Sequence, residues 1–218
     1  MKSNQQGFTL VEIAIVLVII GLLLGGVVKG QELMTQAKIK NVANDFNGIA
    51  AAVYAYQDRY KALPGDDNGA KARWTNTANG NRNGALGEDF TASTADAEVR
   101  LFWQHLRFSG LIAGDTASQE QPLNAVGGII GAQTNSGPAA TPDLAGLVIC
   151  SSNLSGKIAN AVDNQLDDGV PTRGSVRGYK QTAGITVGSD VSGILRQAPT
   201  DAAYVDDGAA LYTLCKAI

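Results

Sequence analysis

Hydrophobic residues form one long run near the start of the chain, from Phe8 to Val28, in which Glu12 is the only charged residue. As a helix this run is about 31 Å long, close to the roughly 30 Å hydrocarbon core of a bilayer. Elsewhere in the sequence the apolar runs are much shorter. The pattern therefore predicts a single membrane-spanning helix over residues 8–28.

The residues around this run indicate its orientation. Lys2 precedes it and the bulk of the chain follows it, so the positive-inside rule places the N-terminus in the cytoplasm and the rest outside. A cleaved secretory signal peptide is one alternative, but the run is long for that role and no small-x-small site closes it. A plain membrane anchor is the better alternative.

A second pattern follows, in which hydrophobic residues recur at alternating steps of three and four, as on one face of a helix. These residues are Ile39, Val42, Phe46, Ile49, Val53, Tyr56 and Tyr60. The first proline is Pro64, in the turn sequence 63–65. We therefore expect one helix from about Phe8 to about Tyr60, with its second half packed on a globular domain.

Residues 63–218 alternate short apolar runs with Gly, Asn and Pro, which is typical of a small antiparallel sheet with many turns. Strands are expected at 128–130, 144–149, 184–187 and, with breaks, 204–214. Helices are expected over Asp96–Leu111 and Lys157–Leu166, and an irregular loop over Trp74–Glu88. The predicted fold class is α+β, with the long N-terminal helix packed on the sheet.

Charge and residue types narrow the functional classes. The 17 basic and 20 acidic residues give a net charge of -3, which does not indicate nucleic acid as a partner. His105 is the single histidine, and without a Cys/His cluster we expect it at the surface or partly buried in a helix, not as a ligand or a base. Phosphate-loop, dinucleotide and zinc patterns are missing from the sequence. We expect no enzymatic activity.

Glu12 is the residue that a plain anchor does not explain. A carboxylate in an apolar helix is unfavourable unless it has a partner. A subunit that must find a specific neighbour in the membrane has a use for such a group. The amino terminus of an adjacent subunit is a suitable cation if the chain is cut just before Phe8.

The sequence Gly7-Phe8-Thr9-Leu10-Val11-Glu12 resembles the prepilin processing motif of type IV pilins and type II secretion pseudopilins. The resemblance implies that a prepilin peptidase cuts after Gly7 and methylates the new N-terminal Phe8. It also implies that Glu12 pairs with the amine of a neighbour during assembly. The chain then divides into a leader at 1–7, a membrane or filament-core half-helix at 8–28, an amphipathic half-helix at 29–62 and a head at 63–218.

The same resemblance implies a place and partners. The precursor is expected as a single-pass protein of the bacterial inner membrane, in contact with lipid and with its head in the periplasm. Expected partners are the prepilin peptidase, the inner-membrane assembly platform and further copies in a helical filament, either an extracellular pilus or a periplasmic pseudopilus. The lack of a proline near Lys29 favours a pseudopilin, whereas the loop-rich head favours a pilin of attachment, motility or DNA uptake. A membrane-anchored enzyme or ligand-binding domain is a third alternative.

Cys150 and Cys215 are the only cysteines, and in an exported domain such a pair is expected to form a disulfide. Closing a loop of about 65 residues stabilises a fold by roughly 4 kcal/mol in the chain-entropy model. In the pilin family a C-terminal disulfide often delimits an exposed loop region, which agrees with this pairing.

Three further patterns have two interpretations each. Asp163, Asp167 and Asp168 are candidate Ca²⁺ ligands, but their spacing departs from the EF-hand, and we favour a solvated turn. The sequence 153–155 fits a glycosylation sequon, a match that often arises by chance. Four glycines near the end of the apolar run either loosen the helix or permit close helix packing. They are Gly21, Gly25, Gly26 and Gly30.

Overall fold

The longest element is helix α1, which runs over 51 residues from Leu10 to Tyr60 and confirms the single long helix expected from the sequence. It ends where Lys61 adopts a left-handed backbone conformation, with φ of 53°, just before the turn at Pro64. By length and composition α1 is able to cross a membrane, and its most apolar 18-residue window is 0% buried.

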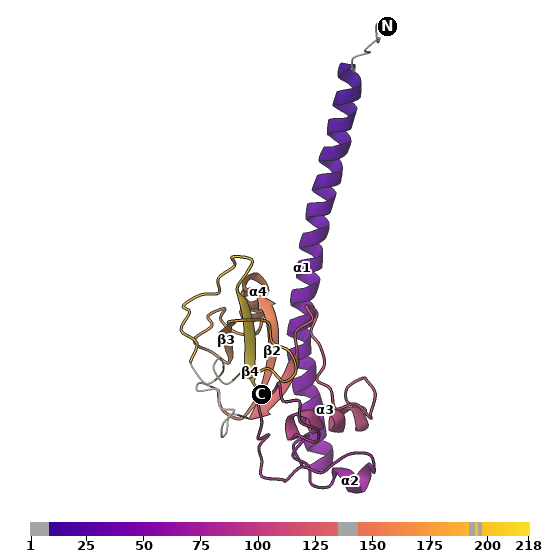
Figure 1. Cartoon of the computed structure of the whole chain (residues 1–218), viewed down its shortest axis with the longest axis vertical. Coiled ribbons are helices and arrows are strands. Elements are labelled where there is room, and N and C mark those ends of the chain that lie inside the picture. The colour runs from indigo at the N-terminus through magenta and orange to yellow at the C-terminus, as the bar shows by residue number, and fades with distance from the viewer. Residues whose placement is uncertain (1–8, 135–143, 192–194, 196–197) are drawn as a thin grey trace, which may run out of the picture. The chain divides into compact units, whose positions relative to one another are not determined.

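The computed structural model describes residues 9–134, 144–191, 195 and 198–218 (Figure 1). The chain divides into two compact units, Met1–Ala37 and Lys38–Ile218, so α1 contributes to both. After α1 the elements follow in the order α2 (Ala70–Arg73), α3 (Glu98–Phe108), β1 (Ile130–Thr134), β2 (Leu147–Ser155), α4 (Gly156–Leu166), β3 (Val176–Gln181) and β4 (Leu211–Ala217). The α+β class predicted from the sequence is therefore confirmed.

The sheet of the second unit has the strand order β1-β2-β4-β3, and the three pairings are antiparallel. The two central strands place Cys150 directly opposite Cys215. Strand β3 lies at one edge, and two of its outward backbone N–H groups bind the preceding loop. The N–H of Gly178 donates to the carbonyl oxygen of Pro171, and that of Val176 donates to the carboxylate of Asp167.

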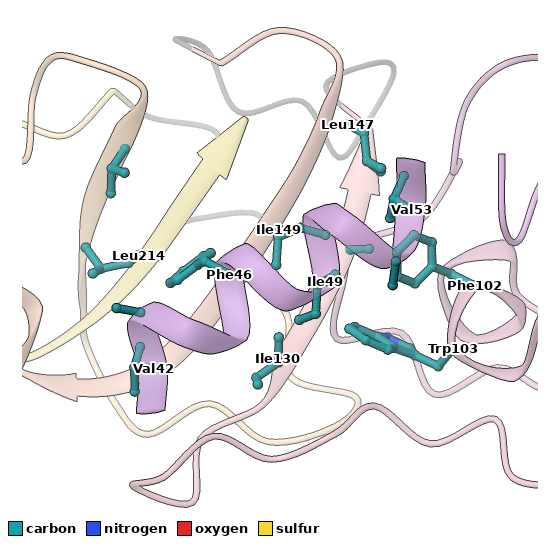
Figure 2. Close-up of a cluster of buried hydrophobic side chains, with 14 of the residues drawn as sticks. Val42, Phe46, Ile49, Val53, Phe102, Trp103, Ile130, Leu147, Ile149 and Leu214 are labelled. Carbon is teal, nitrogen blue, oxygen red and sulfur yellow. The ribbon is translucent and has the colours of Figure 1, made fainter. Parts of the chain in front are cut away.

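The core of the second unit forms where the striped face of α1 meets the sheet and α3. Phe46 and Val53 are 1% exposed, and the same cluster contains Trp103, Ile149 and Leu214 (Figure 2). A fully buried side chain of this size contributes about 1.5–3 kcal/mol to folding. The predicted stripe is confirmed, and only Tyr60, at the end of the helix, is partly buried.

Helices α3 and α4 lie where the sequence predicts them, whereas α2 was not predicted. The strands expected at 128–130 and 144–149 overlap β1 and β2 only at 130 and at 147–149. Residues 184–187 form no strand, because the side chain of Asn153 binds both the N–H and the C=O of Ile185, which a ladder would need. Residues 204–210 lie outside β4, and the carboxylate of Asp207 accepts the N–H groups of Ala209 and Ala210. The expected loop over residues 74–88 is confirmed.

Strand β3 is absent from the sequence-based prediction. Its sequence, VRGYKQ, contains two cations and a glycine, so its strand propensity is low. The hydrogen bonds of β4 on one side and of the loop at Pro171 on the other fix its extended conformation. Such tertiary contacts cannot be recognised in a six-residue sequence window.

Candidate functional site

The N-terminal end of α1 is closed by two of its own side chains. The backbone N–H and the hydroxyl of Thr9 both donate to Oε2 of Glu12, each at 2.7 Å. The backbone N–H of Glu12 donates in turn to the Thr9 hydroxyl oxygen at 3.3 Å. This is the reciprocal capping box, which satisfies N–H groups that every helix leaves free at its start.

Thr9 was not predicted from the sequence as a partner of Glu12, and this carboxylate was treated as unpaired within its own chain. The sequence Thr9-x-x-Glu12 has the spacing of a capping box, so this partner was predictable. The carboxylate therefore has two donors inside its chain, both on Oε2, and within the described residues Oε1 can accept further hydrogen bonds.

The helix surface that follows is apolar and unused within the described part of the chain. Large side chains between Leu10 and Val28 are 46% to 87% exposed, and Leu22 is 74% exposed. A Cβ added at Gly21, Gly25, Gly26 or Gly30 would meet no heavy atom within 4 Å. Packing inside the chain therefore does not require these glycines, and both of their interpretations remain predictions.

The expected processing site, Gly7 and Phe8, lies outside the described residues, as does the leader at 1–7. Cleavage after Gly7 and methylation of Phe8 therefore stay predictions. The described helix begins at Leu10, two residues beyond the expected cut.

The two cysteines form the disulfide that the sequence predicts. Cys150 and Cys215 are joined at an S–S distance of 2.06 Å, and both are fully buried. The bond links neighbouring strands β2 and β4, in a second cluster that includes Val148 and Tyr179. It fastens the last strand of the chain to the centre of the sheet.

The three candidate calcium ligands lie together at the C-terminal end of α4. One carboxylate oxygen from each of Asp163, Asp167 and Asp168 lies within 4.8 Å of the others. A protein donor already binds one oxygen of each group, whereas Oδ1 of Asp163 is buried without a partner among the described residues. Tyr204 donates to Asp163 at 2.6 Å, the Val176 N–H donates to Asp167 at 3.0 Å, and Asp168 is 3.2 Å from Arg173.

Burial raises the pKa of the Asp163 carboxyl, and the hydrogen bond from Tyr204 acts in the opposite direction. These contacts describe a turn that is fixed by its own side chains. Calcium binding stays a prediction, and the solvated turn is the alternative that the contacts favour.

Asn153, the first residue of the sequon, has a structural role. It lies in the irregular part of β2 with φ of 61°, and its Nδ2 donates to the carbonyl oxygen of Ile185 at 2.9 Å. Its Oδ1 accepts the N–H of the same residue at 2.7 Å. Both ends of the Asn153 amide are therefore used within the fold, and glycosylation of the sequon stays a prediction.

His105 is neither at the surface nor partly buried, and this expectation was wrong. Its side chain is 0% exposed, because α3 turns it toward the chain segment that follows α1. Both ring nitrogens contact backbone groups, of Gly65 and Ala78. Burial lowers the pKa of His105, so the imidazole is neutral near pH 7. His105 therefore has a structural role, and neither of its ring nitrogens is free to act in catalysis.

Comparison with known proteins gives one finding. No curated protein and no solved structure matches this chain. Residues 2–28 match the family model described as the prokaryotic N-terminal methylation motif, which covers the capped end of α1 and its apolar surface. Members of this class are structural subunits. The chain therefore carries the prepilin-type signal of type IV pilins and pseudopilins.

Proposed function

We propose that the processed chain is a structural subunit of a type IV pilus-like filament, assembled through the first half of α1. The observation that carries this proposal is the exposed apolar surface of α1 over residues 10–28, which no contact within the described chain uses. Lipid covers such a surface before assembly, and copies of the same helix cover it in the filament core. Because lipid tails are as apolar as these side chains, close packing between helices and polar contacts, rather than transfer out of water, favour assembly.

The capping box gives Glu12 a role that is compatible with both states. In the single subunit its Oε2 accepts from Thr9, which lowers the penalty of placing the carboxylate in an apolar environment. Cleavage after Gly7 would create a new amino group on a neighbouring subunit. A carboxylate accepts several hydrogen bonds, so Glu12 can bind that amine without losing Thr9. Glu12 would then set the register between neighbours.

The proposal includes the partners and the place expected from the prepilin signal. A prepilin peptidase would remove residues 1–7 and methylate Phe8, and an inner-membrane platform would extract the subunit into the filament. The head, with its buried disulfide, would reside in the periplasm and then outside the cell. An oxidising compartment is where such a bond persists.

Substitution of Glu12 tests the register. We expect Glu12→Ala to abolish incorporation into filaments, and Glu12→Gln to reduce it strongly, because an amide cannot pair with an ammonium group as a carboxylate does. The measurement is electron microscopy of filaments with mass spectrometry of their subunits. Glu32→Ala is the matched control, since it removes an exposed carboxylate of the same helix that pairs only with Lys29. Normal incorporation of the Glu12→Ala chain would refute the assigned role.

Intact mass tests the processing step separately. The mature protein should lack residues 1–7 and carry one additional methyl group on Phe8. A membrane-derived protein that keeps its first seven residues would exclude the whole proposal.

A periplasmic pseudopilus is the second candidate, and one observation favours it. Residues 1–63 contain no proline, whereas many pilins carry one near the position of Lys29. The same microscopy separates the candidates. Long surface filaments of this subunit support a pilus, whereas subunits confined to short periplasmic fibres support a pseudopilus.

A further inference from the structure

The two partners of the single histidine of the chain determine the tautomer of its neutral ring. The backbone N–H of Gly65 donates to Nδ1 of His105 at 3.0 Å. Its Nε2 lies 3.1 Å from the carbonyl oxygen of Ala78, which can only accept. The proton of the neutral ring therefore resides on Nε2, and Nδ1 is an acceptor.

Through these contacts His105 holds one segment of chain at two points. Residues 63–85, here called the 63–85 segment, follow α1 and include Gly65 and Ala78. The neighbours of His105 on α3 also bind this segment through polar groups. Gln104 accepts the hydroxyl of Thr77 at 2.7 Å, and Glu98 accepts the N–H of Asn81 at 2.9 Å. These hydrogen bonds hold the segment on α3 together with the packing of Trp74 on Phe108.

The backbone at Gly65 is packed closely against α3 and against Gly80. Gly65 has φ of 88°, and a Cβ there would lie 2.4 Å from the carbonyl oxygen of Glu98. A Cβ at Gly80 would lie 2.2 Å from the carbonyl oxygen of Gly65. A proton on Nδ1 would face the N–H of Gly65, and two donors cannot form a hydrogen bond with each other.

The charged groups around the imidazole are already paired. Asp67 lies on the segment, where Tyr56 of α1 donates to its carboxylate at 2.7 Å and the guanidinium of Arg73 also binds it. The Tyr56 ring stacks at 6.4 Å on that of His105. Asp67 favours a charged imidazole and Arg73 opposes it, so burial decides the balance.

The two remaining acids near the ring have other partners. Asp66 accepts the N–H groups of Asn83 and Gly84 at 2.9 and 2.8 Å. Glu98, on α3, accepts that of Asn81. A protonated His105 therefore gains no new carboxylate partner among these groups, and it loses the hydrogen bond from Gly65.

We propose that His105 is a pH-sensitive switch that holds the 63–85 segment on α3 at neutral pH and releases it on acidification. The step is the transfer of one proton from solvent to Nδ1, with loss of the hydrogen bond from Gly65. Trp74 lies on this segment and packs on Tyr60 and Phe108, with ring centroids 5.4 and 5.5 Å apart. Release exposes these rings and changes the surface next to the end of α1.

The test follows the two tryptophans and the histidine of the full chain in detergent micelles. The chain carries 5-fluorotryptophan and ¹⁵N-labelled histidine, and its spectra are recorded from about pH 8 to about pH 4. We expect the imidazole nitrogens to show the Nε2–H tautomer at neutral pH. As His105 takes up its proton, the Trp74 resonance should move toward that of free fluorotryptophan with the same midpoint. Trp103, which is fully buried on α3, should not move with it.

Variants separate this switch from general acid sensitivity. In His105→Asn the side-chain oxygen keeps an acceptor for Gly65 but does not titrate, so the pH-dependent movement of Trp74 should disappear. Asp163→Asn is the control, because it removes a buried acid of α4 and should leave the Trp74 midpoint unchanged. If His105→Asn does not fold, the coincidence of the two midpoints in the unsubstituted chain decides the question. Exposure of Trp74 while His105 remains neutral, or protonation of His105 without movement of Trp74, would overturn the proposal.

Discussion

Helix α1 contributes to two units that differ in how far they bury its apolar side chains. Up to Ala37 its large apolar side chains are exposed, as with Leu17 at 64%, whereas beyond Lys38 those of the stripe pack into the core, as with Phe46 at 1%. The second unit completes its core from its own chain. In our proposal lipid or other copies cover the apolar surface of the first unit. Fold stability and assembly should therefore be separable by mutation.

The largest effect is expected from truncating the buried part of the stripe. Phe46→Ala should lower the free energy of unfolding of the second unit by about 3–5 kcal/mol, since it leaves a cavity against the sheet. Leu17→Ala should change it by less than about 0.5 kcal/mol while weakening filament assembly. Denaturant unfolding followed by near-UV circular dichroism measures both. Comparable destabilisation by the two variants would contradict the conclusion that only the second unit uses its apolar side chains for fold stability.

Removal of the disulfide is expected to have the next largest effect, again confined to the second unit. The double variant Cys150→Ala, Cys215→Ala should lose up to about 4 kcal/mol, because the unfolded chain regains the freedom of a loop of 65 residues. Chemical denaturation of the two proteins gives the difference. The prepilin signal is unchanged in this variant, so an intact-mass spectrum should still show processing. Loss of processing would indicate that the peptidase requires a folded head.

Acidification should destabilise the second unit through His105. Its pKa is lowered in the folded state, so below the ordinary value of 6.5 the unfolded chain binds the proton more tightly. The free energy of unfolding should be at its full value above pH 6.5 and should fall as the pH drops below it. Denaturation curves of the unsubstituted chain and of His105→Asn measure this difference. A parallel decline in both would assign the acid sensitivity to other groups.

The smallest effect is expected from calcium. The carboxylates of Asp163, Asp167 and Asp168 are held by Tyr204 and by neighbouring donors, so the turn does not require an ion to be fixed. Added Ca²⁺ should leave the midpoint of thermal unfolding unchanged relative to a sample with chelator. A midpoint that rises with calcium concentration would show binding to the folded state and restore the calcium alternative.

The sequence predicts those parts of the molecule whose signal is local or periodic. The helical stripe from Ile39 to Tyr60, the helices α3 and α4 and the prepilin signal all have such signals, and all are found. The disulfide was predictable because only two cysteines exist and an exported domain pairs them. The capping box also has a local signal, the spacing Thr9-x-x-Glu12, but it was not predicted.

The parts that escaped prediction depend on contacts distant in sequence. Strand β3 is extended because β4 and the Pro171 loop bind it, and residues 184–187 are not a strand because Asn153 takes their backbone groups. His105 is buried because a glycine turn 40 residues earlier folds over it. None of these partners is evident from the residue itself.

The covered edge of β3 has a consequence for how this protein associates. Open sheet edges invite further strands, and a chain that is concentrated in a membrane or in a fibre meets its copies constantly. Here the N–H groups of Val176 and Gly178 are taken, and Lys180 adds a charge at the same edge. Addition of a further strand at this edge would have to displace these contacts, so the edge is protected against amyloid-like association of neighbouring copies.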